Sequence, residues 1–185
     1  MAGAACTGSG VGPTRIKRVI GIAKAYTTRV GSGPMPTEIM DDLGNKIRER
    51  GGEFGATTGR PRRCGWFDAV QVKYACNLNG MDSLILTKLD VLSGMEKIKI
   101  NVAYKCGSKI VEKMPEGSKD WEEYKPVYEE MEGWNENVAE IKRFEDLPTN
   151  AKKYIHRIEE LTGNNIVMIS VGAKRTQIII RESPY

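Results

Sequence analysis

A short apolar stretch, Ser83-Leu84-Ile85-Leu86, constrains the fold of this chain more than any other segment. Its apolar residues are consecutive, and turn-forming residues lie on both sides of it. A run of this length and pattern is typical of a strand that is buried on both faces. Strands of that kind occur in parallel sheets that are covered by helices. The run therefore predicts an α/β fold built around a mainly parallel sheet.

Three segments of the sequence predict helices. Pro13 to Tyr26 has apolar residues at three- and four-residue steps behind a proline suited to a first helical turn. Asp68 to Leu78 begins at an N-capping aspartate and ends before Asn79-Gly80. Pro148 to Gly163 carries one apolar stripe, opened by the proline and closed by the glycine.

Further strands are predicted from short apolar runs and from alternation of apolar and polar residues. They cover residues 97–105, 108–113, a segment around 126–129, 165–170 and 176–181, with a hairpin at Gly107. Because helices and strands alternate, we expect an α/β domain with flanking helices and an antiparallel edge or hairpin. A length of 185 residues fits a single domain over 1–185.

Composition excludes several classes of protein. The only histidine is His156, so H-E-x-x-H peptidase and Cys₂His₂ zinc motifs are impossible, and no G-x-S-x-G elbow presents a serine. The 28 basic and 24 acidic residues give a net charge of +4, which is not gathered into a stripe. We therefore expect no nucleic-acid partner.

The predicted location is the cytoplasm. No apolar run approaches the roughly 18–20 residues that span a membrane, and the chain does not start with the pattern of a signal peptide. The four cysteines form no C-x-x-C pair, which favours free thiols in a reducing compartment. We expect no membrane partner.

An arginine-rich loop is the first segment that carries chemistry. Residues 54–66 read FGATTGRPRRCGW and place three guanidiniums, two threonine hydroxyls and three flexible glycines together. Forked cations and free backbone N–H groups suit an anion such as a carboxylate or a phosphate. A solvated basic turn explains the same composition equally well, so both interpretations stay open.

The second segment follows the buried strand and reads LILTKLD, from Leu84 to Asp90. The Asp90 carboxylate can accept hydrogen bonds from the ring N1–H and the amino group of guanine, while the Lys88 stem covers the ring. The alternative is a strand end with a capping aspartate. Ser170-Val171-Gly172 likewise follows a predicted strand, where it is either a turn against a base or a plain turn.

Several long motifs together resemble adenylosuccinate synthetases. They are TGSGVGP (7–13), KAYTTRVGSGPMPTE (24–38), EFGATTGRPRRCGWFD (53–68), LTKLDVL (86–92) and the closing YIHRIEELTG, ISVG and RTQIIIRE. The resemblance extends through the whole chain and matches the C-terminal part of that P-loop-NTPase-like family. It implies the ligation of IMP and L-aspartate to adenylosuccinate in AMP biosynthesis, driven by GTP, which phosphorylates the purine 6-oxygen.

The resemblance also implies roles for particular residues. The aspartate-binding loop corresponds to Ala56, Thr57, Thr58, Gly59, Arg60, Pro61 and Arg62. IMP contacts correspond to Arg60, Val30 and Gly31. GTP contacts correspond to Arg62, Lys88, Leu89, Asp90, Ser170, Val171 and Gly172. On this basis residues 1–66 form a loop- and helix-rich IMP and aspartate part, and residues 67–185 form an α/β guanine-nucleotide part.

The family's phosphate loop, catalytic aspartate, catalytic histidine and Mg²⁺ ligands are expected in a preceding N-terminal part that this sequence does not match. We therefore expect no catalytic residue and no metal ligand here, and little activity from this chain alone. The resemblance further implies a homodimer for the full-length enzyme. The alternative hypothesis is a catalytically incomplete guanine-nucleotide-binding fragment or module.

Overall fold

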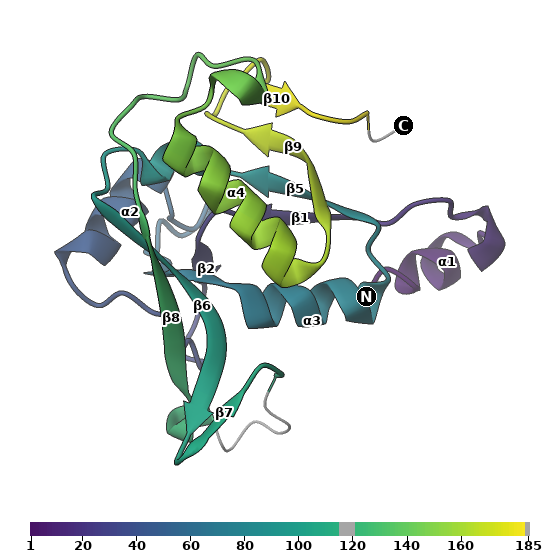
Figure 1. Ribbon diagram of the computed structural model, residues 1–185. Coiled ribbons are helices and arrows are strands. Elements are labelled where there is room, and N and C mark those ends of the chain that lie inside the picture. The colour runs from purple at the N-terminus through teal and green to yellow at the C-terminus, as the bar shows by residue number, and fades with distance from the viewer. Residues whose placement is uncertain (115–120, 184–185) are drawn as a thin grey trace.

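The computed structural model describes residues 1–114 and 121–183, and its centre is a four-stranded sheet (Figure 1). The strand order is β1 (Ile20–Lys24), β5 (Ser83–Thr87), β9 (Asn165–Ser170) and β10 (Ile178–Ile180). β1, β5 and β9 are parallel, and β10 is antiparallel to β9. This arrangement confirms the mainly parallel sheet with an antiparallel edge, although β10 is shorter than expected.

β5 lies between two partner strands, as its apolar run predicts. Leu84 and Leu86 are buried, and each pairs with a residue of β1 on one side and of β9 on the other. The helix α4 (Thr149–Thr162) passes in front of these strands in Figure 1 and buries Tyr154 and Ile155. Backbone pairing with β1 and β9, together with the burial of its leucines, thus holds the central strand in place.

α3 (Ala69–Asn79) begins and ends where its capping residues predict. The Asp68 carboxylate accepts a hydrogen bond from the Gln71 backbone N–H at 3.1 Å, which satisfies a free donor of the first turn. Gly80 ends the helix in the left-handed region, with φ of 58°. α4 ends in the same way at Gly163, with φ of 76°.

A second sheet extends away from the main one as a long arm in Figure 1. β6 (Lys97–Cys106) pairs antiparallel with β8 (Lys125–Glu132) and β7 (Lys109–Val111), and parallel with β4 (Phe67–Asp68). The expected hairpin at Gly107 is confirmed, and the strand expected around 126–129 is longer than its sequence pattern indicates.

The helix expected from Pro13 to Tyr26 is wrong. Only Pro13–Arg15 forms a turn of 3₁₀ helix (η1), and Ile20–Lys24 forms strand β1. The spacing of the apolar residues is helical, but the β-branched Ile20 and Ile22 suit a strand, and pairing with buried β5 outweighs the helical spacing here. Gly21 disfavours a helix, and a Cβ there would lie 2.3 Å from the Met81 sulfur, so a larger residue would force that side chain to shift.

Apart from α2, which has 10 residues, the remaining elements of the described residues are short. They are α1 (Ala4–Ser9), β2 (Thr27–Arg29), α2 (Asp42–Gly51), β3 (Arg63–Gly65), η2 (Leu89–Leu92), η3 (Trp121–Glu123) and η4 (Phe144–Asp146). β2 and β3 pair antiparallel, so the first 66 residues hold strands as well as loops and helices. All four cysteines are free, and none of the helices in the described ranges could cross a membrane.

Candidate functional site

The carboxyl ends of the parallel strands meet at one edge of the main sheet. Lys24 ends β1, Thr87 ends β5 beside it in register, and Ser170 ends β9 on the other side of β5. Open α/β sheets bind ligands at this edge. The topology thereby brings the two segments expected to contact guanine, 88–90 and 170–172, onto neighbouring strands.

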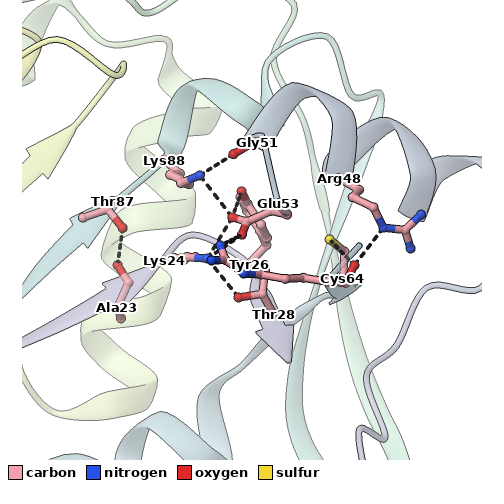
Figure 2. A network of polar contacts seen from close by, with 11 residues as sticks. Ala23, Lys24, Tyr26, Thr28, Arg48, Gly51, Glu53, Cys64, Thr87 and Lys88 are labelled. Carbon is pink, nitrogen blue, oxygen red and sulfur yellow. Dashed lines mark hydrogen bonds and ion pairs between the residues drawn. The ribbon is translucent and has the colours of Figure 1, made fainter. Parts of the chain in front are cut away.

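Glu53 is the centre of a charge cluster at this edge (Figure 2). Its side chain has no exposed surface, and both carboxylate oxygens accept hydrogen bonds from the Lys24 ammonium at 2.8 Å. Tyr26 donates its hydroxyl to Oε1 at 2.7 Å, Arg62 donates Nη1 to Oε2 at 2.8 Å, and the Lys88 Nζ lies 3.1 Å from Oε1. One buried anion is thus shared by three cations.

The ionisation of Glu53 follows from these contacts. Burial alone would raise the pKa of the carboxyl, but the hydrogen bonds from Lys24, Tyr26, Arg62 and Lys88 outweigh it and lower the pKa to about 2. Burial, together with the hydrogen bond to Glu53, raises the pKa of Tyr26, which therefore remains a hydrogen-bond donor. At neutral pH the cluster carries three positive charges and one negative charge.

Lys88 has an unusual backbone conformation. Its φ of 62° makes it the one non-glycine residue with positive φ within the described ranges. Such a conformation costs free energy for a residue with a Cβ, and it persists where the surroundings impose it. The turn between β5 and η2 aims the ammonium at Glu53 and at the carbonyl of Gly51, to which it also donates.

The other two members of the guanine segment differ in exposure. Asp90 is half-buried, and this burial raises the pKa of its carboxyl. Leu89 has no exposed surface and belongs to the core. The side chain of Leu89 is therefore not available to a ligand, whereas Asp90 retains some exposed surface.

The turn 170–172 is held by its own hydrogen bonds. The Ser170 hydroxyl donates to the carbonyl of Gly172 at 2.9 Å, and the backbone N–H of the buried Val171 donates to the carbonyl of Gln177 at 3.0 Å. A Cβ at Gly172 would lie 2.3 Å from the Gln177 side-chain oxygen. A larger residue at position 172 would therefore force the Gln177 side chain to shift.

The arginine loop, residues 54–66, follows Glu53 directly in the chain. Its ends are tied by hydrogen bonds from Gly55 N–H to the Arg60 carbonyl and from Gly59 N–H to the Gly55 carbonyl, both 2.8 Å. The residues at its tip are exposed: Ala56, Thr57, Thr58, Gly59, Arg60 and Pro61. Throughout residues 1–114 and 121–183 the Arg60 guanidinium has no partner, in contrast to Arg62.

Val30 and Gly31 lie beside this loop. β2 and β3 pair Arg29 with Arg63, so the residues just after β2 are next to the residues just before β3. Arg63 donates Nη1 to the Gly31 carbonyl at 3.1 Å and forms an ion pair with Glu38 at 2.5 Å. The segment expected to contact IMP and the arginine loop are thus brought together at one end of the β2–β3 ribbon.

Sequence reasoning missed three members of the charge cluster: Lys24, Tyr26 and Glu53. Assigning residues 13–26 to a helix hid the fact that Lys24 ends a strand at the ligand edge. Nothing in the local sequence marks Glu53 as buried, because its partners come from distant segments. The described residues contain no group of three or more His, Cys, Asp and Glu side chains that could hold a metal ion.

An α/β fold whose parallel strands end at clustered cations and glycine-rich loops is typical of proteins that bind phosphorylated ligands. Comparison with known families agrees with this class, because the adenylosuccinate synthetase model matches residues 1–179. The chain belongs to the adenylosuccinate synthetase family.

Individual relatives support the same assignment. The chain is 57% identical over 181 residues to the adenylosuccinate synthetase of Desulforamulus reducens, and 56% identical over 176 residues to that of Clostridioides difficile. These matches cover 98% and 95% of this chain, but only 42% and 41% of the relatives. The chain thus spans about two fifths of their length.

Solved structures show the same relationship. The fully ligated adenylosuccinate synthetase from Plasmodium falciparum matches with a TM-score of 0.94 and 42% identity, over 97% of this chain and 43% of that one. A succinoaminodeoxyadenylate synthetase from cyanophage S-2L, with a TM-score of 0.55 and 16% identity, shares the fold.

Proposed function

We propose that this chain is the part of an adenylosuccinate synthetase that binds the guanine nucleotide and the aspartate and IMP substrates. The complete enzyme ligates IMP and L-aspartate at the expense of GTP, as a purine-biosynthetic ligase. The observation that carries this proposal is the common edge of the main sheet. There the segments after β5 and β9 lie side by side, and Glu53 joins Arg62 to the same edge.

The guanine base is recognised by Asp90. Its carboxylate accepts hydrogen bonds from the ring N1–H and the exocyclic amine, a pair of donors that adenine lacks. The Lys88 ammonium is occupied by Glu53 and Gly51, so the aliphatic stem is the part left to cover the base. Backbone groups of Leu89 and of the turn 170–172 complete this pocket.

The arginine loop binds the substrate carboxylates. Arg60 is exposed and unpartnered within the part of the chain that the structure describes, so its fork of donors is free for a bidentate carboxylate. Thr57 and Thr58 add hydroxyls at the loop tip. Val30 and Gly31, next to the loop, face the ribose of IMP.

Arg62 serves the nucleotide side of the site. Glu53 directs its guanidinium toward Lys24 and Lys88, at the edge where the nucleotide is expected. The net positive charge of the cluster attracts the polyphosphate.

The chemical step itself is a phosphoryl transfer followed by displacement. The γ-phosphoryl group of GTP passes to the 6-oxygen of IMP, and the aspartate amine then displaces phosphate. We assign to this chain the binding and orientation of the reactants, and to the remainder of the enzyme the catalytic aspartate and histidine. The described residues do not fit a Mg²⁺ site, so the metal's ligands are assigned to the remainder as well.

A second candidate is a guanine-nucleotide-binding module without ligase activity. The share of the relatives that this chain covers, 41–43%, favours this alternative for the chain in isolation. In the complete enzyme we propose a cytoplasmic homodimer.

Calorimetry with GDP and ADP tests the guanine part of the proposal. We expect GDP to bind more tightly than ADP, and equal affinities would contradict the proposal.

Adding the part of the Desulforamulus reducens enzyme that this chain does not cover tests the ligase. Adenylosuccinate formed only in the mixture supports the enzyme, whereas GDP binding without product favours the module.

A further inference from the structure

Glu53 connects segments for which different ligands are proposed. Arg62 belongs to the arginine loop, and Lys88 belongs to the guanine segment after β5. Both contact the one buried carboxylate, at 2.8 Å and 3.1 Å. Figure 2 shows Glu53 enclosed between Lys24 and Lys88, with Tyr26 completing the contacts.

The contacts leave Arg62 free to bind a ligand while it is anchored. It uses Nη1 for Glu53, and in the described parts of the chain its Nε and Nη2 have no partner. Its side chain is 30% exposed and that of Lys88 is 34% exposed. Lys24, in contrast, directs its ammonium to Thr28 and to both oxygens of Glu53.

The balance of charge makes these contacts interdependent. Three cations share one anion whose side chain has no exposed surface, so weakening one ion pair changes the electrostatic field on the other two. Residues in one such network show coupled free energies rather than additive ones. The cluster therefore links the position of the arginine loop to that of the guanine segment.

We propose that Glu53 is a positioning residue that couples the arginine loop to the guanine segment through its shared contacts with Arg62 and Lys88. A ligand that engages Arg62 then alters the Lys88 side of the site, and a nucleotide at Lys88 alters the loop. This inference rests on the proposed function for the identity of the ligands, but the coupling is a property of this chain by itself.

Backbone amide chemical shifts of the 185-residue chain test the coupling without any ligand. Arg62→Leu should shift the amides of Lys88, Leu89 and Asp90 several times more than Arg60→Leu does. The two changes are matched in chemistry, and only Arg62 touches Glu53, whereas Arg60 lies at the exposed tip of the loop. Equal shifts at 88–90 for both variants would overturn the proposal.

A second set of variants asks whether the effect passes through Glu53. In a Glu53→Gln background, Arg62→Leu should no longer shift the 88–90 amides, because the shared carboxylate is gone. Glu53→Asp keeps the charge and should restore part of the effect. Glu129→Gln, on β8, removes the carboxylate partner of another arginine, Arg157 on α4, and should leave the 88–90 amides unchanged. An undiminished effect of Arg62→Leu in the Glu53→Gln background contradicts the coupling.

GDP titration separates this inference from the proposed function. GDP should shift the amides of Gly55 to Arg62 in the wild-type chain and much less in Glu53→Gln. If GDP binds and shifts the loop amides equally in the wild-type chain and in Glu53→Gln, the coupling is contradicted. A wild-type chain that shows the mutational coupling but binds no GDP contradicts the proposed nucleotide site and leaves the role of Glu53 supported.

Discussion

Arg62 and Lys88 bind opposite oxygens of one carboxylate, Arg62 at Oε2 of Glu53 and Lys88 at Oε1. One cation comes from a loop that follows α2, and the other comes from the turn that follows β5. The pair is brought together only when the main sheet and the loop are both folded. The position of either segment is therefore tied to the integrity of the other.

The first prediction concerns Asp90. Asp90→Asn should weaken GDP binding by about 1.5–3 kcal/mol, because one acceptor for the guanine donors becomes a donor. That free energy corresponds to roughly a ten- to hundredfold loss of affinity. Titration calorimetry with GDP measures it, and ADP provides the comparison. An unchanged preference for GDP over ADP would show that Asp90 does not read the base.

The second prediction divides the work of the two arginines. In the complete enzyme, Arg60→Leu should raise the KM for aspartate about ten- to hundredfold, since a charge-assisted pair of hydrogen bonds is lost. Arg62→Leu should act mainly on the KM for GTP. Steady-state kinetics with each substrate varied in turn distinguishes the two roles. Equal effects of both changes on the KM for aspartate would contradict the proposed roles of the two arginines.

Many elements of residues 67–185 could be predicted from the sequence because their signals are local, whereas α2 and the strands β1 to β3 could not. The buried run at β5, the caps at Asp68 and Gly80 and the stripe on α4 each act within a few residues. β1 could not be separated from a helix by its spacing, because the parallel partner that decides its conformation lies far along the chain at Ser83–Thr87.

The same difference between local signals and distant partners decides which parts of the candidate site could be predicted. The arginine loop and the segment 87–90 stand out because charged and glycine residues are contiguous in the sequence. The cluster at Glu53 does not, because Lys24, Arg62 and Lys88 reach it from three separate elements. A lone glutamate between glycine and phenylalanine is normally exposed, and only the tertiary fold shows that it is buried.

The third prediction concerns the attachment of α4 to the ligand edge. The buried hydroxyl of Tyr154 donates a hydrogen bond to the carbonyl of Ala25, directly after β1, at 2.6 Å. Tyr154→Phe should lower the free energy of unfolding by about 1–2 kcal/mol, because a buried acceptor loses its donor. Urea unfolding measures this change. Tyr74→Phe, at a side chain that is 50% exposed, is the matched control and should change stability by less than about 0.5 kcal/mol. Equal losses in both variants would contradict the assignment.

The last prediction concerns the dependence of stability on pH. The pKa of Glu53 is lowered from the ordinary 4.5 to about 2, so the unfolded chain binds this proton more readily than the folded one. The stabilisation is therefore complete above about pH 5 and is lost as the pH falls toward 2. Its full size is about 3 kcal/mol, by the free energy that each pKa unit represents. Glu53→Gln should thus be least stable relative to wild type at neutral pH, and the gap should narrow in acid. Urea unfolding between pH 2 and 7 measures the gap, with the half-exposed Glu129→Gln as the control, whose gap should stay below about 1 kcal/mol. A gap for Glu53→Gln that does not change with pH would mean that the carboxylate charge is not what stabilises the cluster.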